Sequence, residues 1–496
     1  MGKDIVFSPD ILRQERALRL DGAMGTQIQR FNLTEADFRQ GLPVLPTRDV
    51  KGNNECLNLT RPDVISSIHR SYVEAGADII ETNSFGANTM VQRDYGLSSI
   101  ARDMAFAAAR LAREAADSAS RKVWVAGSIG PGSKSLSLVA DFTRPEWRPC
   151  SFDEVAASYA GQARALIEGG VDVIIIETCF DALNAKAALY GVQEARPGFP
   201  VIVSVSVSGS SGRVLTGQSL EAFFTAVSHS PLSAFGLNCS MGVEGLIPLV
   251  RSLGAWCPVP LVCYPNAGLP NASGGYDESP DAMSCQMAEL DGEVNLYGGC
   301  CGTSPDHIHA LPALRSRVVP DCDKSLVLSG LEMWNLGNGS ISVSTASHVG
   351  KSAGFAGMME RGEYEEALYA VSDQLATDGA KLLDVNLDGL PDTPAAMERF
   401  IRLIQSDPSV SSAALLIDSS DMDTLIQGLK NAQGKSLAGP QDPRDAGFVG
   451  KASTLRRLGA ALLVKACDDR PRVLQELASV GVPPQDIVFE DMLRPS

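Results

Sequence analysis

Residues 171–179 read VDVIIIETC, and this stretch decides the fold. Its apolar run has little polar alternation, which is typical of a parallel strand that is covered on both faces. Polar residues follow at once, in ETCFD (177–181). The same unit, a short apolar strand that ends in polar or glycine-rich residues and leads into a helical segment, recurs along the first part of the chain.

We predict seven further strands of this kind between residues 17 and 299. Helical segments separate them, and 61–76 and 100–119 carry apolar residues at intervals of three and four. Eight βα units predict a closed (β/α)₈ TIM barrel, with an open doubly wound sheet as the alternative. We favour the barrel because it gathers the polar strand ends around one mouth. The seven strands are ALRLDGA (17–23), ADIIETN (77–83), VWVAGSIG (123–130), PVIVSVSV (200–207), AFGLNCS (234–240), PLVCYPN (260–266) and EVNLYGG (293–299).

A second βα region follows, so we divide the α/β chain into a barrel at 1–325 and an incomplete second barrel-like domain at 326–496. We expect at most six strands there, and the chain ends five residues after the last of them. An open barrel would expose strand edges. The missing part is then supplied by another chain, or the region is a reduced remnant. The six are ISVST (341–345), KLLDVNLD (381–388), ALLIDSS (414–420), GKSLAG (434–439), GAALLVKAC (459–467) and DIVFED (486–491).

Composition narrows the class of partner and the compartment. The formal net charge is −17, which argues against nucleic acid or an anionic membrane as the main partner. The first residues lack the apolar core of an export signal, and no apolar run is as long as a membrane span. Eleven cysteines in such a chain indicate reduced thiols in the cytoplasm, some of them free to bind a metal.

Three cysteines stand where the barrel would bring them together. Cys300 and Cys301 lie in YGGCCGTSPDHI (297–308), at the end of the eighth strand, and Cys239 ends the sixth. Three thiolates with one open position describe a catalytic type of zinc site. The flanking glycines would let both adjacent sulfurs point inward. The alternative is three ordinary cysteines, a residue type that is often buried.

Asn266 ends the seventh strand, between the two thiol-bearing strands. It is either a weak oxygen ligand that a substrate displaces or a residue that completes a turn. A zinc-bound thiol loses its proton near neutral pH, and three anionic sulfur ligands keep a fourth, substrate thiolate nucleophilic. This chemistry suits alkyl transfer to a thiol better than hydrolysis.

A second group of strand-end residues would hold an α-amino acid. Asp21 and Glu177 are carboxylates that could receive an ammonium group. The amides of Gly22 and Ala23, with the hydroxyl or amide of Thr82, could receive a carboxylate. For each carboxylate alone, capping of the following helix is the alternative.

Several of these segments are familiar together. LDGAMGTQIQ, ETCFDALNAKAAL, GLNCSMG, CYPNAGLPN and GGCCGTSPDHI, within about residues 10–315, resemble the homocysteine-binding barrel of the cobalamin-dependent methionine synthases, of the homocysteine S-methyltransferase family. The resemblance implies that the sulfur of homocysteine joins three zinc ligands and that six further residues lie near the substrate. The implied ligands are Cys239, Cys300 and Cys301, and the implied substrate residues are Asp21, Gly22, Ala23, Thr82, Glu177 and Asn266.

Residues 331–496 resemble the tetrahydrofolate-binding (pterin-binding) barrel that comes next in those enzymes. The family's opening Gly-Glu-Arg-Thr-Asn appears here as STASH (344–348), and its Asp-Pro-Asn as residues 490–492, so we regard tetrahydrofolate binding as doubtful. No cobalamin-binding module is recognised, which would place methylcobalamin on a partner protein. The residues that match polar strand-end positions of the family, as pterin-site remnants, are Asp384, Asn386, Asp388 and Asp418.

The sequence therefore predicts a zinc-dependent, cytoplasmic homocysteine S-methyltransferase that forms methionine from L-homocysteine, with Cys239, Cys300 and Cys301 as its catalytic residues. The methyl group would come from a separate methylcorrinoid protein. Two alternatives stay open: a small sulfonium or ammonium methyl donor, or a non-autonomous subunit that binds homocysteine and zinc and completes a methyltransferase with a partner chain.

Overall fold

The computed structural model describes residues 7–272, 274–321 and 324–496. Its first unit is a parallel sheet in the order β1-β8-β7-β6-β5-β4-β3-β2. All eight predicted strands are confirmed, and so is the barrel rather than the open sheet. Their bounds are β1 Leu18–Arg19, β2 Ile79–Glu81, β3 Trp124–Ile129, β4 Val173–Cys179, β5 Val201–Val205, β6 Leu232–Cys239, β7 Leu261–Pro265 and β8 Leu296–Tyr297.

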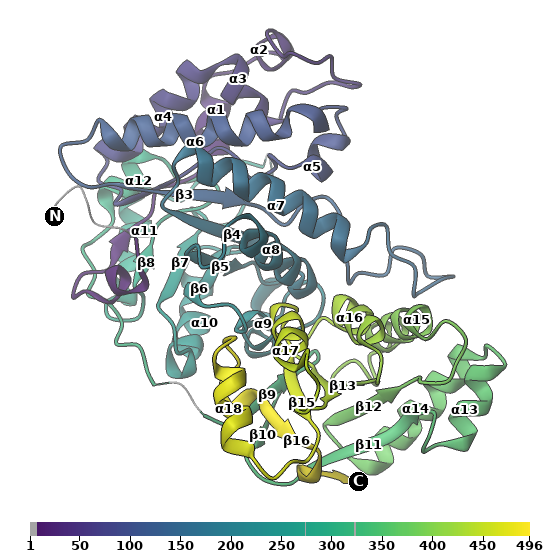
Figure 1. The fold of residues 1–496 in the computed structure, drawn as a ribbon. Coiled ribbons are helices and arrows are strands. Elements are labelled where there is room, and N and C mark those ends of the chain that lie inside the picture. The colour runs from purple at the N-terminus through teal and green to yellow at the C-terminus, as the bar shows by residue number, and fades with distance from the viewer. Residues whose placement is uncertain (1–6, 273, 322–323) are drawn as a thin grey trace.

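Helices surround this sheet (Figure 1), and the helical segments predicted at 61–76 and 100–119 form α4 and α6. The α-helices are α1 Met24–Arg30, α2 Glu35–Arg39, α3 Leu57–Thr60, α4 Pro62–Glu74, α5 Thr89–Arg93, α6 Ala101–Asp117, α7 Phe152–Gly169, α8 Ala182–Ala195, α9 Leu220–Val227, α10 Val243–Trp256, α11 Pro280–Met287 and α12 Pro305–Ala310. Short 3₁₀ turns are η1 Pro9–Arg13, η2 Asn54–Cys56, η3 Ser98–Ile100, η4 Gly209–Ser211 and η5 Ala288–Leu290.

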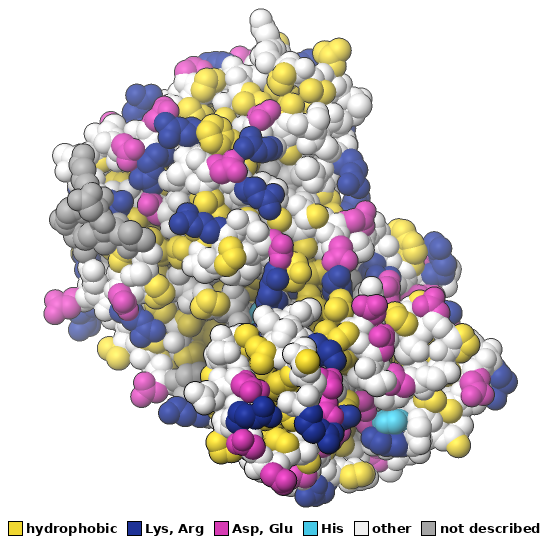
Figure 2. Space-filling view, in the orientation of Figure 1, with side chains coloured by type: hydrophobic (Ala, Val, Ile, Leu, Met, Phe, Trp, Pro, Cys, Tyr) yellow, Lys and Arg dark blue, Asp and Glu magenta, His cyan; other side chains and the backbone are white. Residues whose placement is uncertain are grey.

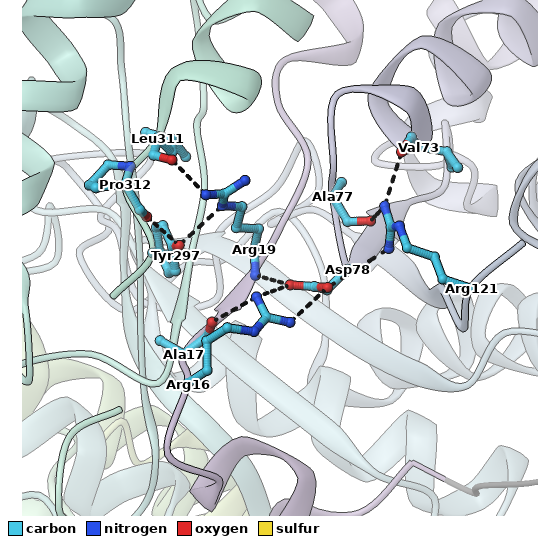
Figure 3. A network of polar contacts seen from close by, with 10 residues as sticks. All are labelled: Arg16, Ala17, Arg19, Val73, Ala77, Asp78, Arg121, Tyr297, Leu311 and Pro312. Carbon is cyan, nitrogen blue, oxygen red and sulfur yellow. Dashed lines mark hydrogen bonds and ion pairs between the residues drawn. The ribbon is translucent and has the colours of Figure 1, made fainter. Parts of the chain in front are cut away.

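The barrel closes between its first two strands through one bridge, Leu20 to Ile79. Polar contacts reinforce this seam (Figure 3): Asp78 accepts hydrogen bonds from the Arg19 amide at 2.9 Å and from the Arg16 guanidinium at 2.9 and 3.0 Å. On the other side of β1, the Arg19 side chain donates to the carbonyl of Leu311 at 2.6 Å. The network holds β1 in place although that strand is only two residues long.

The barrel interior is packed with apolar side chains. Inward-facing residues such as Ile175, Ile202 and Val262 are buried in one cluster. Phe7, Ile11 and Leu12, from the segment that precedes β1, belong to the same cluster. A filled interior leaves the mouth at the C-terminal ends of the strands as the place for a site, as is general for this fold.

The second unit is a parallel sheet in the order β16-β15-β14-β13-β12-β11-β17. The six predicted strands are confirmed, and the fold class with them. The strands are β11 Ile341–His348, β12 Leu382–Asn386, β13 Ala414–Asp418, β14 Leu437–Gln441, β15 Ala461–Val464, β16 Ile487–Phe489 and β17 Leu493–Pro495. The other elements are α13 Ala353–Glu360, α14 Tyr364–Asp378, α15 Thr393–Ser406, α16 Met422–Asn431, α17 Phe448–Arg457, α18 Arg470–Ala478, η6 Pro484–Asp486 and η7 Glu490–Met492.

The prediction of at most six strands in this region is wrong: the sheet has a seventh strand, β17, and a separate hairpin precedes the sheet. β17 pairs in parallel with β11, from Ile341–Leu493 to Val343–Pro495. Only η7 separates β17 from β16, so one continuous segment pairs with β15 at its start and with β11 at its end. This arrangement covers the edge of β11 that we expected to be exposed. A three-residue strand ending in proline carries no periodicity by which it could be recognised.

A hairpin that the sequence did not predict lies between the two units. β9 Leu326–Ser329 pairs with β10 Met333–Gly337. Leu326 and Leu328 join the inward-facing cluster of the second sheet, which includes Leu382 and Leu416. The hairpin therefore contributes apolar side chains to the hydrophobic core enclosed by the second sheet.

The two units touch along α7 and α8. The buried ammonium of Lys186, on α8, donates to the carbonyls of Ala432 at 3.0 Å and Gly434 at 3.1 Å. Lys430 pairs with Asp153 at 2.7 Å nearer the surface. Figure 2 shows two lobes that meet at a narrower waist where basic and acidic side chains lie close together. Within the described ranges, no helix is both long and apolar enough to cross a bilayer.

Candidate active site

A cavity of about 470 Å³ opens at the C-terminal ends of the strands of the first barrel. Asn266 does not line it but is 3% exposed, and it lies close enough to Cys239 to help lower the pKa of that thiol. All nine residues that we predicted for this mouth thus lie in or beside one space. The eight that line the cavity are Asp21, Gly22, Ala23, Thr82, Glu177, Cys239, Cys300 and Cys301.

The three predicted thiols converge. The sulfur atoms of Cys239, Cys300 and Cys301 all lie within 4.8 Å of one another. Cys239 is the last residue of β6, while Cys300 and Cys301 follow β8. The intervening strand β7 holds the segment in place, because its Pro265 carbonyl accepts a hydrogen bond from the Cys300 amide at 2.7 Å.

Left-handed backbone conformations aim these strand ends. Thr178 (φ 56°), Cys239 (φ 56°) and Ser240 (φ 63°) adopt a region that costs energy for residues with a Cβ and that clusters at functional sites. Asn238 stabilises the arrangement. Its Oδ1 accepts from the Thr178 amide at 2.9 Å, and its Nδ2 donates to the Thr178 hydroxyl at 2.9 Å.

Close packing explains two of the glycines around the paired cysteines. A Cβ at Gly299 would stand 2.5 Å from Thr303, whose hydroxyl donates to the Cys300 carbonyl at 2.7 Å. Gly302 has φ +84°, and a Cβ there would also meet Tyr276 at 2.4 Å. The first glycine allows the turn to pack tightly, and the second provides the left-handed bend after the two cysteines.

The thiols share their protons unevenly. Hydrogen bonds from Cys300 and Cys301 lower the pKa of Cys239. The same bonds to Cys239 raise the pKa of Cys300 and of Cys301. The three thiols therefore favour loss of a proton at Cys239 first. Binding of a cation would release the remaining protons.

Four carboxylates line the same cavity: Asp21, Glu55, Glu81 and Glu177. Glu55 already accepts a hydrogen bond from the Gly86 amide at 2.6 Å. Burial raises the pKa of Glu177 to about 7, although the Ser128 hydroxyl donates to it at 2.5 Å. Burial, together with the neighbouring carboxylates, also raises the pKa of Asp21 and of Glu81. Oε1 of Glu81 is buried without a hydrogen-bond partner. Such a group of acids favours a cationic ligand.

Two of the predicted carboxylate-binding donors already have partners. The Ala23 amide donates to the Thr303 hydroxyl at 3.1 Å, and the Thr82 amide donates to the Ala126 carbonyl at 3.0 Å. The hydroxyl groups of Thr82 and Ser84 are hydrogen-bonded to each other at 2.6 Å. At Gly22 a Cβ would lie 2.7 Å from Thr303. A ligand carboxylate would have to compete for the hydroxyls or meet the Gly22 backbone.

Sequence reasoning missed Glu81, Asn238 and Tyr276. Glu81 directly precedes Thr82, so its place at a strand end was a usable signal. Asn238 is the residue before Cys239, and we did not consider its side chain. Tyr276 comes from the loop after β7 and lowers the pKa of Cys301. No strand-end rule places a loop residue of this kind.

The residues present fit a zinc ion. Three sulfurs lie close enough to share one ion, and the buried Oδ1 of Asn266 beside them has no hydrogen-bond partner. Thiolate and carbonyl-type oxygen are ligands that zinc accepts. Cys179, which also ends a strand, lies outside this group and points its sulfur at the Ile176 carbonyl.

The second sheet brings together some of its predicted residues. Asp384 and Asp418 come within 4.8 Å of each other and of His348, a residue that we had not considered as a ligand. Asn386 pairs with Asp418 in the register of β12 and β13. Asp388 turns away and accepts from the Ser419 hydroxyl at 2.5 Å and from the Ser420 amide at 3.0 Å, which ties two loops together.

Comparison with known proteins agrees with this picture. Residues 18–314 match the homocysteine S-methyltransferase family, and residues 349–490 match the pterin binding enzyme family. The first match spans more than half of the chain, so the protein belongs to the homocysteine S-methyltransferase family. It is a methyltransferase with a homocysteine S-methyltransferase domain and a pterin-binding domain.

Solved structures with similar folds include the homocysteine methyltransferase MmuM from Escherichia coli. Its oxidised form is 24% identical, with 59% of this chain and 94% of that chain covered and a TM-score of 0.48. Its metallated form is 25% identical, with 61% and 97% covered and a TM-score of 0.47. The carboxyl transferase domain of Rhizobium etli pyruvate carboxylase is 12% identical, with 59% and 41% covered and a TM-score of 0.35.

Proposed function

We propose that this chain is a zinc-dependent homocysteine S-methyltransferase that forms methionine and takes its methyl group from a separate methylcorrinoid protein. One observation carries the proposal: three converging thiols and four carboxylates, Asp21, Glu55, Glu81 and Glu177, line a single cavity. The thiols suit a soft cation and a thiol ligand, and the carboxylates suit an ammonium group. A small molecule that carries both a thiol and an ammonium fits this combination.

In this proposal Cys239, Cys300 and Cys301 hold the zinc ion, and Asn266 supplies an oxygen beside it. When bound, zinc would lower the pKa of a substrate thiol so that it is deprotonated near neutral pH. Tyr276 lowers the pKa of Cys301 and would limit the charge that gathers on its sulfur. The strained strand end at Cys239 fixes the direction of its sulfur before any ligand arrives.

Asp21, Glu81 and Glu177 orient the substrate by its ammonium group. Burial raises the pKa of all three, and repulsion from neighbouring carboxylates adds to the raised pKa of Asp21 and Glu81. An ammonium group in their midst would favour their ionised forms. The substrate carboxylate would then face the Gly22 backbone and the hydroxyl of Thr82. Both ends of the amino acid are held, so its sulfur points to the thiols.

The methylcorrinoid donor is supported by the order of the two domains. A thiol-binding barrel followed by a pterin-type unit is the order of the cobalamin-dependent methionine synthases that the sequence resembles, and the family matches fall in the same order. We propose 1–325 and 326–496 as the two domains, the second being a reduced pterin-binding unit. The altered strand end at 344–348 continues to argue against tetrahydrofolate as its ligand.

The test is methionine formation by the zinc-loaded protein with homocysteine and four donors in parallel: methylcobalamin, methyltetrahydrofolate, a methylsulfonium compound and a methylammonium compound. We expect turnover with methylcobalamin alone. Turnover with the sulfonium or ammonium donor instead would replace the corrinoid part of the proposal. No turnover with any donor would contradict the function.

The zinc ligands are tested with Cys301→Ala and its matched control Cys285→Ala, since Cys285 is exposed on α11. We expect Cys301→Ala to lose bound zinc and at least about 100-fold in turnover, because even the loss of a residue that supports a metal ligand costs 10–100-fold. Cys285→Ala should retain both. Metal analysis of the purified proteins and the methionine assay give the two readouts.

A further inference from the structure

The second sheet presents a polar cluster that neither the proposed reaction nor the zinc site uses. It consists of His348, Asp384 and Asp418, from the neighbouring strands β11, β12 and β13 (Figure 1). One ligand atom of each lies within 4.8 Å of the other two, and Nε2 of His348 stands 3.6 Å from Asp418. We refer to these three residues as the mouth triad.

A bulge in β11 turns His348 toward its partners. The register between β11 and β12 pairs Ser344 with Leu383 and then Ser347 with Val385, so β11 carries one extra residue between these pairs. His348 pairs with Asn386, which in turn pairs with Asp418. Bulges re-aim side chains and recur beside functional sites. The histidine is therefore directed to the side of the sheet that the two aspartates occupy.

Asp384 provides an independent sign of a missing ligand. The residue is 1% exposed, and its Oδ1 is buried without a hydrogen-bond partner. Its other oxygen, Oδ2, accepts from the ammonium of Lys351 at 2.9 Å. A buried carboxylate oxygen without a partner is costly, and such oxygens are usually satisfied by a donor or a cation. Its location beside an imidazole and a second carboxylate favours a cation.

The surroundings leave room for one. A cavity of about 240 Å³ is lined by Asp384 and Asp418, with Lys351, Thr345 and Glu490 on its other walls. Asp384 and Asp418 are like charges in close proximity, and one ammonium group serves only one of them. A divalent cation would neutralise both and satisfy Oδ1.

We propose that the mouth triad binds a divalent cation that prefers nitrogen and oxygen ligands, of the Mn²⁺ type. Imidazole together with carboxylates suits first-row metals, and two carboxylates without thiolate favour the harder members of the series. The triad would supply three ligands and leave the remaining positions open to the cavity. Lys351 competes with the metal for the carboxylate of Asp384, and this competition lowers the affinity for the metal.

Manganese is the probe for the full-length protein. The metal-free chain is titrated with Mn²⁺, and free Mn²⁺ is followed by electron paramagnetic resonance. We expect one bound ion per chain. His348→Gln and Asp384→Asn should each weaken binding at least tenfold, since each removes a ligand. Lys351→Met should tighten binding, because it frees Asp384 from its ammonium partner. A gain of affinity cannot result from misfolding.

Cys301→Ala separates this site from the thiol site. Manganese binds thiolates poorly, so the variant should bind Mn²⁺ as the wild type does even where it has lost zinc. The proposal is overturned by any of three results: no Mn²⁺ bound by either wild type or Lys351→Met, affinity unaffected by His348→Gln and Asp384→Asn, or binding abolished by Cys301→Ala.

Discussion

At the scale of single residues, the site combines thiols and carboxylates whose pKa values are shifted from their ordinary range in the absence of a ligand. Hydrogen bonds from Cys300 and Cys301 lower the pKa of Cys239, and burial raises the pKa of Asp21, Glu81 and Glu177. Repulsion between carboxylates adds to the raised pKa of Asp21 and Glu81. We infer that a cationic ligand would lower the pKa of these carboxylates, which couples affinity to pH.

The first prediction concerns that coupling, measured with methionine so that no substrate thiol titrates. The pKa of Glu177 is raised to about 7 in the free protein. An ammonium ligand favours the ionised carboxylate, so protonation opposes binding and affinity should rise with pH from about 5.5 to 7.5. A shift of one pKa unit corresponds to about tenfold. Calorimetric titration at both pH values measures it.

Glu177→Gln is the control, because the amide keeps the shape but does not titrate. We expect weaker binding and a flatter pH profile in this variant. A profile as steep as that of the wild type would mean that another group causes the dependence.

The positions of the strand-end residues were the most predictable part of the site. The sequence placed the three cysteines and Asp21, Thr82 and Glu177 at one mouth because parallel strands bring their C-terminal ends together, and these residues do line one cavity. Their roles stay predictions. Asn238 and His348 were missed for another reason. Their orientation depends on a side-chain network and on a bulge, and neither leaves a periodic trace in the sequence.

At the scale of elements, two glycines of α7 differ in whether the packing around them leaves room for a side chain. The helix begins with a capping box between Ser151 and Glu154 and ends before Gly170, at φ 102°. Within it, a Cβ at Gly169 would stand 2.4 Å from the Cβ of Ala109 on α6. A Cβ at Gly161 would meet nothing within 4 Å. The first glycine permits close helix contact, and the second only weakens the helix.

The second prediction compares these two positions on one helix. Gly169→Ala should destabilise the protein by about 1–3 kcal/mol, the usual cost of overpacking. Gly161→Ala should stabilise it by up to about 1 kcal/mol, because alanine is the better helix former. Thermal unfolding of the two variants beside the wild type gives the sign directly. Two changes of the same sign would contradict the packing argument.

The strands show where sequence prediction of elements stops. Long apolar runs such as Val173–Cys179 were recognised at once, and every strand of that kind is present. β17 was missed because it has three residues and depends on its distant partner β11. The β9–β10 hairpin was missed because its strands have only four and five residues and are defined by their pairing. Short strands are defined by their partners rather than by their own composition.

At the scale of the whole molecule, the two units are joined by buried as well as exposed contacts. Lys186 is 1% exposed, and its ammonium serves two carbonyls of the second unit. Burial lowers the pKa of Lys186 to about 7. The Lys430–Asp153 pair spans the same junction nearer to solvent. The second sheet therefore has extensive support from the first unit of the same chain. Completion of the second unit by a partner chain stays a prediction.

The third prediction contrasts the two lysines. Lys186→Met leaves the carbonyls of Ala432 and Gly434 without their donor and should cost about 1–3 kcal/mol. Lys430→Ala removes an exposed ion pair and should cost less than about 1 kcal/mol. Denaturant unfolding, with limited proteolysis near residue 325, reports both stability and separation of the units. Equal effects of the two changes would contradict the importance of the buried contact.

The central claim is that three thiols hold a zinc ion that deprotonates homocysteine, and proton release on binding tests it most directly. The zinc-loaded protein at pH 7 is titrated with homocysteine and with methionine in buffers of different ionisation enthalpy. Both ligands disturb the carboxylates equally, but only homocysteine has a thiol proton to lose. We predict about one additional proton for homocysteine in the wild type and none in Cys301→Ala. Equal proton release for the two ligands in the wild type would contradict the account.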